Sequence, residues 1–470
     1  MKRTTTTKIT YMGLLFSMIL SCKKFVEVEP PPTQLVRESV FSSNTTATAA
    51  VLGIYTTMVN TTSFANGGAS SISVLSGLSA DELVSYSGST NANYQFYQNA
   101  LLPDNSALNT AIWANAYKYI FAANQVIKGL EGANVTPAIK SQLTGEALFI
   151  RAFCHFYLVN LFGDIPLAIT TDYETNTAAG RTPKAEVFKQ IIEDLKNAQG
   201  LLMEAYIKPD GTIYPIASAQ RVRPNKYAAT ALLSRVYLYN EEWSNAEQQA
   251  STVIGKSDYY SIMDNLNGVF LPTSTEAIWQ FNNTNAAAEA TYFTFSGAPT
   301  RLTLSDQLMN AFEANDKRKT NWTKMITSGT KTYYQAFKYK VASGTPATEF
   351  STILRLSEQY LIRAEARAKL DKLDIAKEDL NKVRLRAGLI ATTANDKASI
   401  LTAILHERQT ELFTEWGHRW LDLKRTGTED AVMGAVTPLK GGTWNTNWML
   451  YPIPTNQIVS DPNSSQNLGY

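Results

Sequence analysis

The stretch QLTGEALFIRAFCHFYLVNLFGDIPL, residues 142–167, carries the clearest structural pattern in the chain. Its apolar residues recur every three or four positions, which is the spacing of one helical face. The residues of this face are Leu143, Ala147, Ile150, Cys154, Tyr157, Leu158 and Leu161. Phe149, Phe153 and Phe156 widen the face, so we expect a helix that is covered on more than one side. Gly163 suits a left-handed C-cap and Pro166 forbids continuation, so the helix is expected to end there.

Similar helical patterns recur on both sides of this stretch. We expect a short helix at 46–60 and further helices at 109–132, 183–203, 224–239, 243–254, 353–370, 374–387 and 398–414. Pro183 and Pro224 stand near helix starts, Asp374 suits an N-cap, and Gly388 suits a C-cap. Helix pairs that recur at about 35–45 residues are typical of tetratricopeptide-like units, and an irregular all-α protein is the alternative. The predicted fold class is therefore mainly α, with a tetratricopeptide-like scaffold of helical hairpins.

Two regions interrupt the helices. Residues 61–108 are rich in Ser, Asn, Gly and Thr with scattered tyrosines and no period, which predicts a long irregular loop. Residues 256–350 form an insert whose strand-like pieces lie at 276–281, 291–295 and 332–341. We assign the scaffold mainly to 105–255 and 350–425, the ligand-binding loops mainly to 61–108 and 256–350, and a C-terminal segment to 426–470.

The first residues of the chain are typical of an export signal. A basic start precedes an apolar run at 9–20 that is too short to span a bilayer. Cys22 follows this run directly after a small residue, as in a bacterial lipobox, and an ordinary secretory signal is the alternative. We expect a lipoprotein signal peptide at 1–21, a lipidated N-terminus and tether at 22–45, and a single domain at 46–470. Several acyl chains on Cys22 would anchor the protein firmly to a membrane.

Charge and motif content exclude several classes of function. The chain carries 43 Lys and Arg against 41 Asp and Glu, and removal of a leader with Lys2, Arg3 and Lys8 would leave 40 against 41. Such a balance lacks the basic footprint of a nucleic-acid-binding protein. The 3 histidines lack the spacing of a zinc motif, and no nucleotide-binding or serine-hydrolase fingerprint is present. We therefore expect no metal, no cofactor and no nucleic-acid partner.

A group of carboxylates near the C-terminal end raises the possibility of glycoside hydrolysis. Glu407, Glu411 and Glu415 lie four residues apart and share a helix face. Glycoside hydrolysis needs a pair of carboxylates, one of them with a raised pKa, whereas arginines interleaved with these acids would hold them ionised. We therefore expect no catalytic residue and an ion-pair network that fixes the C-terminal segment to the helices. Glu146/Arg151 and residues 363–367 are expected to serve the scaffold in the same way.

Six stretches together resemble a known family. They are LFIRAFCHFYLVNLFGDIPL (148–167), NKYAATALLSRVYLY (225–239), RLSEQYLIRAEARAKL (355–370), LNKVRLRAGL (380–389), HERQTELFTEWGHRWLDLKRTG (406–427) and YPIPTNQIVSDPNSSQNLGY (451–470). Their order and spacing across residues 22–470 are similar to those of the SusD/RagB family, surface lipoproteins of Bacteroidetes. The resemblance implies a lipid-anchored nutrient-binding protein of the cell outer membrane, exposed at the surface, with a SusC-like TonB-dependent transporter as its partner. It also implies a ligand site formed by loops outside the helical scaffold.

An oligosaccharide is the expected ligand, with a peptide or another polymeric nutrient as the alternative. Sugars bind through aromatic rings that stack on their C–H faces and through a few polar groups that bond their hydroxyls. Aromatic residues in irregular, polar stretches are therefore better candidates than those on helical or strand-like stripes. The candidate ligand-binding residues are Asp81, Tyr86, Tyr94, Tyr97, Tyr292, Phe295 and Trp322. A scaffold that binds only proteins and a glycoside hydrolase are the competing functions.

Overall fold

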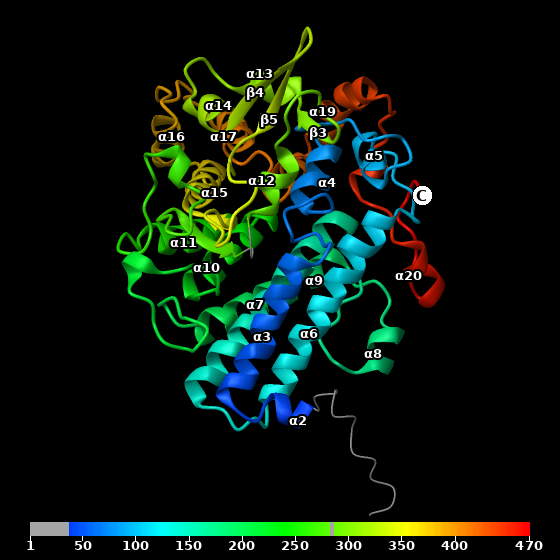
Figure 1. Cartoon of the computed structure of the whole chain (residues 1–470), viewed down its shortest axis with the longest axis vertical. Coiled ribbons are helices and arrows are strands. Elements are labelled where there is room, and N and C mark those ends of the chain that lie inside the picture. The colour runs from blue at the N-terminus through cyan, green and yellow to red at the C-terminus, as the bar shows by residue number, and fades with distance from the viewer. Residues whose placement is uncertain (1–36, 283–285) are drawn as a thin grey trace, which may run out of the picture.

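The structure is a computed structural model that describes residues 37–282 and 286–470 (Figure 1). The expected signal peptide and Cys22 lie outside the described residues. Most of the described chain is helical, as predicted. The helices that build the scaffold are α3 (Asn44–Asn60), α6 (Asn115–Leu130), α7 (Pro137–Phe162), α9 (Lys184–Leu201), α10 (Lys226–Tyr239), α11 (Trp243–Ile254), α15 (Leu356–Lys369), α16 (Leu373–Arg386) and α17 (Lys397–Glu411).

These helices pack in the order of the chain. α6 packs on α7, α7 on α9, α9 on α10, and α10 on α11. α11 then packs on α15, although the whole insert lies between them in the sequence, and α15 packs on both α16 and α17. The insert is therefore placed outside a continuous helical array. None of the helices within 37–282 and 286–470 is long and apolar enough to cross a membrane.

The remaining elements are short. The short helices are α2 (Arg37–Val40), α4 (Ile72–Ser79), α5 (Ala92–Tyr97), α8 (Tyr173–Ala178), α12 (Ala288–Phe293), α13 (Asp306–Ala311), α14 (Lys317–Asn321), α18 (His418–Arg425), α19 (Glu429–Val436) and α20 (Thr455–Ser460). A π-helix, η2 (Ala107–Ala114), leads into α6, and four 3-10 turns include η5 (Thr437–Lys440). The strands β1 (Leu83–Ser85), β2 (Ala277–Phe281), β3 (Leu302–Leu304), β4 (Thr323–Ser328), β5 (Lys331–Ala336) and β6 (Ser351–Arg355) form three antiparallel pairs, β1–β3, β2–β6 and β4–β5.

The helix predicted from residues 142–167 is α7, and it is buried along most of its length. Phe153 and Phe149 pack edge-to-face on Trp279 of β2, with ring centroids 5.3 and 4.8 Å away. The helix ends at Gly163, whose φ of 75° is positive as expected, but whose ψ of −127° lies outside the left-handed helical region. A glycine suits this position because a side chain there would adopt a rare backbone conformation and approach Leu450.

Four sequence-based assignments are wrong. Residues 61–108 are not one irregular loop, because they contain α4, β1 and α5. The segment 291–295 was expected to be a strand but falls largely in helix α12. Residues 351–355 form β6, so the helix expected from 353 begins only at Leu356. Asp374 lies in the first turn of α16, and Lys372 occupies the N-cap.

Two glycines in the helix array predict opposite effects of the same substitution. A Cβ on Gly129 in α6 would collide with the ring of Phe41, whereas a Cβ on Gly53 in α3 would meet nothing within 4 Å. Gly53→Ala should therefore raise the free energy of unfolding by about 0.5–1 kcal/mol, through helix propensity and a less flexible unfolded chain. Gly129→Ala should lower it by about 1–3 kcal/mol through overpacking. Urea denaturation of both variants measures the difference, and equal shifts of the same sign would contradict it.

Candidate functional site

The candidate site is a hollow of about 570 Å³ at the end of the molecule that carries β1, β3 and β5 (Figure 1). We call it the tyrosine hollow, because it is lined by Tyr86, Tyr97, Tyr333 and Tyr334. The other lining residues are Asp81, Leu83, Val84, Thr303, Leu304, Ser305, Asp306, Gln307, Lys331, Thr332, Val436, Leu439 and Lys440. Three parts of the chain that are distant in sequence therefore meet there: the early segment, the insert and the C-terminal segment.

A short antiparallel ladder fixes the early segment against the insert. Leu83 pairs with Leu304 and Ser85 with Leu302 in β1 and β3. The ladder continues beyond the strands, because the Ser305 N–H donates to the Glu82 carbonyl at 2.8 Å. At the other end, the Tyr86 N–H donates to the Arg301 carbonyl, also at 2.8 Å. The backbone of Tyr86 is thus fixed to the insert by this ladder of hydrogen bonds.

The tyrosine rings of the hollow differ in exposure and are held in place by neighbouring side chains. Tyr86 is 42% exposed, and its ring lies edge-to-face against Tyr333 of β5, with centroids 5.8 Å apart and planes at 83°. Tyr97 is nearly buried and contacts Tyr94, with centroids 6.0 Å apart. The Lys440 ammonium lies 5.4 Å from the centre of the Tyr97 ring. Rings held in this way offer apolar faces at a small cost in side-chain entropy, which suits a flat ligand.

Charged groups at the base of the tyrosine hollow are mostly neutralised by partners. Asp81 accepts two hydrogen bonds of 2.7 Å from Arg419, a bidentate pair. The Lys440 ammonium donates to the carbonyls of Leu78 and Ala80 at the C-terminal end of α4. Burial lowers the pKa of Lys440 to about 7. The base therefore offers little net attraction for a charged ligand, while the rim supplies Asp306, Gln307 and Thr332 as groups that could bond hydroxyls.

Glu82 lies buried beside Asp81 and has one oxygen without a hydrogen-bond partner among the described residues. Burial and the neighbouring Asp81 carboxylate raise the pKa of Glu82 to about 8, against the opposing effects of the Thr414 N–H, Arg419 and Lys338. The Thr414 N–H donates to the other oxygen at 3.3 Å. At neutral pH the folded protein therefore keeps a proton on Glu82 that the unfolded chain has released.

Glu82→Gln is expected to remove a pH-dependent loss of stability. Between the ordinary value of 4.5 and about 8, only the folded state binds this proton, so the stability of the wild-type protein falls as the pH rises through that window. A glutamine resembles the protonated acid and does not titrate. The free energy of unfolding of the variant, relative to that of the wild-type protein, should therefore increase by more than about 1 kcal/mol from pH 5 to pH 8. Urea denaturation at several pH values measures this change. A constant difference across this range would contradict the prediction.

The structure brings together only part of the candidate set. Asp81, Tyr86 and Tyr97 line the tyrosine hollow, and Tyr94 touches it through Tyr97. Tyr292 is half-buried beneath the Arg301 guanidinium, 5.6 Å from the ring centre, and is not part of the lining. Phe295 is also outside the lining, and its N–H donates to the Gln335 side chain at 2.7 Å.

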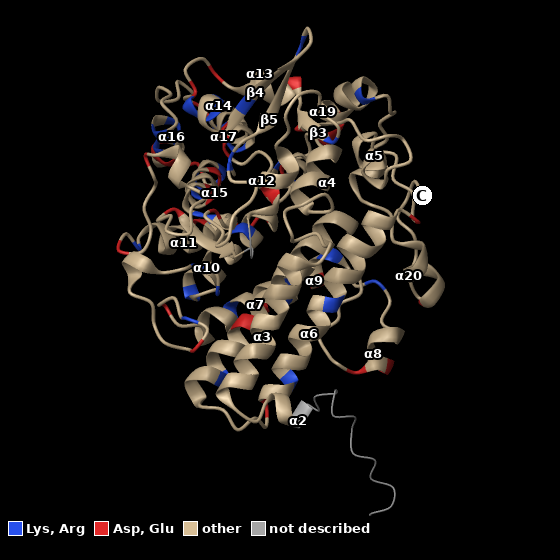
Figure 2. Ribbon diagram, viewed as in Figure 1, with Lys and Arg blue, Asp and Glu red and all other residues tan. Residues whose placement is uncertain are grey.

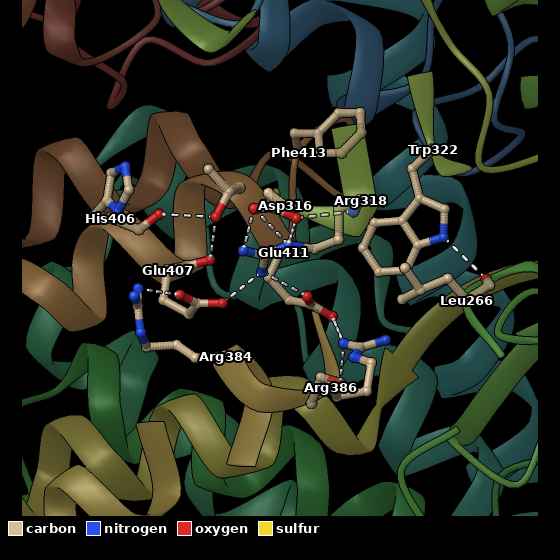
Figure 3. A network of polar contacts seen from close by, with 12 residues as sticks. Leu266, Asp316, Arg318, Trp322, Arg384, Arg386, His406, Glu407, Glu411 and Phe413 are labelled. Carbon is tan, nitrogen blue, oxygen red and sulfur yellow. Dashed lines mark hydrogen bonds and ion pairs between the residues drawn. The ribbon is translucent and has the colours of Figure 1, made fainter. Parts of the chain in front are cut away.

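The expectation that Trp322 is an exposed ligand platform is wrong. Its side chain is fully buried, and its indole N–H donates to the Leu266 carbonyl at 3.0 Å (Figure 3). Lys338 and Arg386 lie over the ring, 4.8 and 5.3 Å from its centre. Trp322 is therefore a core residue that packs under cationic side chains, and no face of it is free for a sugar.

The site also contains residues that the sequence did not single out. Tyr333 and Tyr334 were treated as part of a strand-like run, and Lys440 lay in the unassigned C-terminal segment. The two adjacent tyrosines are a sequence signal that could have identified this part of the site. Neighbours on a strand point to opposite faces, so an edge strand exposes one of the two rings. No sequence signal pointed to Lys440.

The carboxylates that could suggest catalysis form the expected ion-pair network (Figure 3). Arg318 bonds Asp316, Glu407 and Glu411 at 2.7, 2.6 and 2.9 Å, and all four side chains are buried. The pKa of Glu411, which burial alone would raise, is held well below its ordinary value by Arg386, Arg355 and Arg318. Glu407 differs, since burial raises its pKa despite Arg318. Both acids are enclosed by arginines, which suits a structural network and not a sugar-cleaving pair.

Other pairs in the scaffold differ in detail from the expectation. Glu146 and Arg151 do not bond each other. Glu146 accepts from Arg223 at 2.5 Å, and Arg151 from α7 pairs with Asp194 of α9 at 2.6 Å. In the segment 363–367, Arg363 binds Asp379 at 2.6 Å. Arg151–Asp194 and Arg363–Asp379 join one helix to the next, and Arg223–Glu146 joins the segment before α10 to α7. The scaffold role of these residues is therefore confirmed even though the partners are different. Figure 2 shows the charged residues gathered around α14, α15, α16 and α17.

A preformed, ring-lined hollow on a helical array defines a binding surface, and the comparisons with known proteins agree with this fold. The model of the SusD family matches residues 226–470, and a model described as "Starch-binding associating with outer membrane" matches residues 24–238. The chain is 25% identical to SusD-like protein P25 of Formosa agariphila, over 97% of this chain and 96% of the relative. It is 26% identical to SusD-like protein P2 of the same organism, with 98% of each chain covered.

Solved structures share the same fold. A SusD superfamily protein from Bacteroides vulgatus superposes with a TM-score of 0.77 at 21% identity, over 91% of this chain and 99% of that one. A laminarin-binding SusD-like protein gives a TM-score of 0.76 at 23% identity, over 92% and 100%. The SusD family model alone spans more than half of the sequence. The chain therefore belongs to the SusD family, and the resemblance found in its motifs is confirmed.

Proposed function

We propose that this protein binds a neutral oligosaccharide in the tyrosine hollow and passes it to a SusC-like TonB-dependent transporter of the outer membrane, without making or breaking a bond. The tyrosine hollow carries the proposal. It combines four tyrosine rings with amide, hydroxyl and carboxylate groups at its rim, and its basal charges are paired. This is the composition that stacks a sugar ring and bonds its hydroxyls.

The comparisons support a glycan as the cargo. One matching family model carries the words "Starch-binding", and one structural neighbour binds laminarin. Another neighbour is a surface glycan-binding protein from Bacteroides fluxus, with a TM-score of 0.74. A lipid anchor on Cys22 would hold the protein at the outer membrane, where a transporter could receive what it binds. Burial of Glu407 and Glu411 among arginines supports a carrier without catalysis.

Isothermal titration calorimetry of the full chain tests the proposed cargo. The protein is kept in a detergent without a sugar headgroup and titrated with laminarin, starch and other neutral polysaccharides. Saturable binding of at least one glycan, with no release of reducing ends during long incubation, supports the proposal. Failure of every glycan alongside binding of a peptide mixture would favour a peptide cargo. New reducing ends would support a hydrolase.

The proposed partner requires a separate experiment. The full chain, purified from outer membranes under mild detergent, should bring with it a protein of the size and sequence type of a TonB-dependent channel. The measurement is mass spectrometry of the purified complex, with an unrelated outer-membrane lipoprotein as the control. A chain that binds glycan but never co-purifies with a channel would support binding and contradict delivery.

A further inference from the structure

Two hollows adjoin along helix α6, in a part of the molecule that contributes nothing to the tyrosine hollow. One, of about 190 Å³, is lined on α6 by Tyr117, Phe121 and Asn124. The next, of about 530 Å³, continues along the helix to Lys128 and Glu131. The two share Asn124 and Thr170 in their linings. We call the combined feature the α6 trough; its second wall is the segment 166–176, which leads into α8 (Figure 1).

The α6 trough is held open by hydrogen bonds between its walls. Tyr117, Phe121, Asn124 and Lys128 follow each other at steps of four, three and four residues, so they lie on one face of the helix. The Tyr117 hydroxyl donates to the Pro166 carbonyl at 2.8 Å. The Asn124 amide donates to the carbonyls of Ala168 and Thr170 at 3.2 and 3.1 Å. The walls therefore keep their separation without a ligand, which lowers the cost of binding.

Two aromatic rings of the trough are displayed to solvent. Phe121 is 46% exposed and Tyr173, at the start of α8, is 78% exposed. Both rings therefore offer apolar surface to a ligand in the trough. Threonine and asparagine side chains at 170, 171 and 176 lie between or beside them in the lining. Rings and neutral hydrogen-bonding groups thus alternate along the trough.

The charges of the trough already have partners. Lys128 bonds Glu131 at 2.6 Å. Asp172 caps α8 by accepting from the Thr175 N–H at 2.7 Å. An anionic polymer would therefore find no unpaired cation among these residues, and the Asp172 carboxylate would repel it. The chemistry that remains, exposed rings beside the threonine hydroxyls of residues 170 and 171, favours a neutral and hydroxyl-rich chain.

We infer that the α6 trough is a second binding site for a neutral glycan chain, separate from the tyrosine hollow. The inference rests on the proposed function, since it takes the same class of cargo. The two sites share no lining residue. Figure 1 places α8 far from β3 and β5 along the long axis of the molecule. One polymer can therefore be held by the trough while another stretch of it, or a second chain, occupies the tyrosine hollow.

Affinity electrophoresis of the full chain in gels that contain laminarin or starch tests this inference. The variants are Phe121→Ala/Tyr173→Ala in the trough, Tyr86→Ala/Tyr333→Ala in the tyrosine hollow, and the combination of all four. Ile390→Ala, which removes an exposed apolar side chain elsewhere, is the matched control. The trough variant should reduce retardation by the polysaccharide at least threefold. The tyrosine-hollow variant should keep a residual retardation that the quadruple variant loses.

The outcomes separate the two proposals. If wild-type protein is retarded and the tyrosine-hollow variant alone abolishes retardation, while the trough variant behaves like Ile390→Ala, the second site is overturned and the proposed function stands. If no polysaccharide retards the wild-type protein and none binds in calorimetry, the proposed function fails and the second site fails with it. Circular dichroism melting of each variant checks that a loss of retardation does not come from unfolding.

Discussion

Replacement of Tyr86 and Tyr333 by alanine is expected to weaken glycan binding by about 30- to 150-fold. The two rings lie edge-to-face at the mouth of the tyrosine hollow, with centroids 5.8 Å apart, so each fixes the other. An aromatic contact of this kind contributes about 1–1.5 kcal/mol, and removal of both rings should cost about 2–3 kcal/mol of binding free energy. Calorimetry with the best glycan of the panel measures the change in dissociation constant.

The design of this experiment separates binding from folding. Tyr86 is well exposed and Tyr333 is half-exposed, so the free energy of unfolding of the double variant should lie within about 1 kcal/mol of that of the wild-type protein. Ile390→Ala is the control for loss of an exposed apolar side chain outside the hollow. An unchanged dissociation constant in the double variant would move the primary site away from these rings. Because each ring supports the other, the losses from the two single changes are not expected to add up to the loss from the double change.

Replacement of Arg318 by alanine should lower the free energy of unfolding by about 3–5 kcal/mol. Arg318 is fully buried and neutralises three buried carboxylates, at Asp316, Glu407 and Glu411 (Figure 3). Removal of one partner leaves acids in a region that water cannot reach, and this penalty exceeds the net contribution of the pair itself. Glu411 retains Arg355 at 2.5 Å, whereas Asp316 loses the ion-pair partner that it has among the described residues, so Asp316 should bear most of the penalty.

Lys189→Ala provides the matched comparison for Arg318. Lys189 also pairs with a glutamate, Glu186, at 2.7 Å, but both side chains are largely exposed. Exposed pairs contribute about 0–1 kcal/mol, so this variant should be nearly neutral in urea denaturation. A loss below 1 kcal/mol for Arg318→Ala would mean that the network tolerates an unpaired acid. Raised salt should change the Lys189 result more than the Arg318 result, because ions screen exposed charges better than buried ones.

The helical scaffold was predictable because its physical signal is local. In α7 and α11 the apolar spacing and the terminal residues both lie within a few turns. Both bounds of α11 and the C-terminal end of α7 agree with the expectation, although α7 begins earlier than expected, at Pro137. α4 was missed because serines occupy three of its eight positions and hide its burial. α12 was mistaken for a strand because residues 291–295 consist of three aromatic residues and two threonines, whereas the alanines of its first turn favour a helix.

The binding site was only partly predictable, because long-range contacts create it. The polar context of Asp81, Tyr86 and Tyr97 pointed to a surface role, and these residues do line one hollow. The same polar context led to a wrong prediction for Trp322, which is covered by Lys338 from the same insert and by Arg386 from α16. Pairing of β1 with β3 joins residues more than two hundred positions apart. No local sequence feature of either segment predicts that pairing.

The bidentate bond between Asp81 and Arg419 is the point at which the cargo-facing loops meet the helical framework. The displayed tyrosines lie beyond that junction, on segments whose side chains take no part in the buried ion pairs of α15, α16 and α17. Ligand specificity and thermal stability therefore depend on different residues of this molecule and can be altered separately. Substitution of the tyrosines should change which sugars bind. The thermal stability of such a variant should still be set by the unchanged arginines of the ion-pair network.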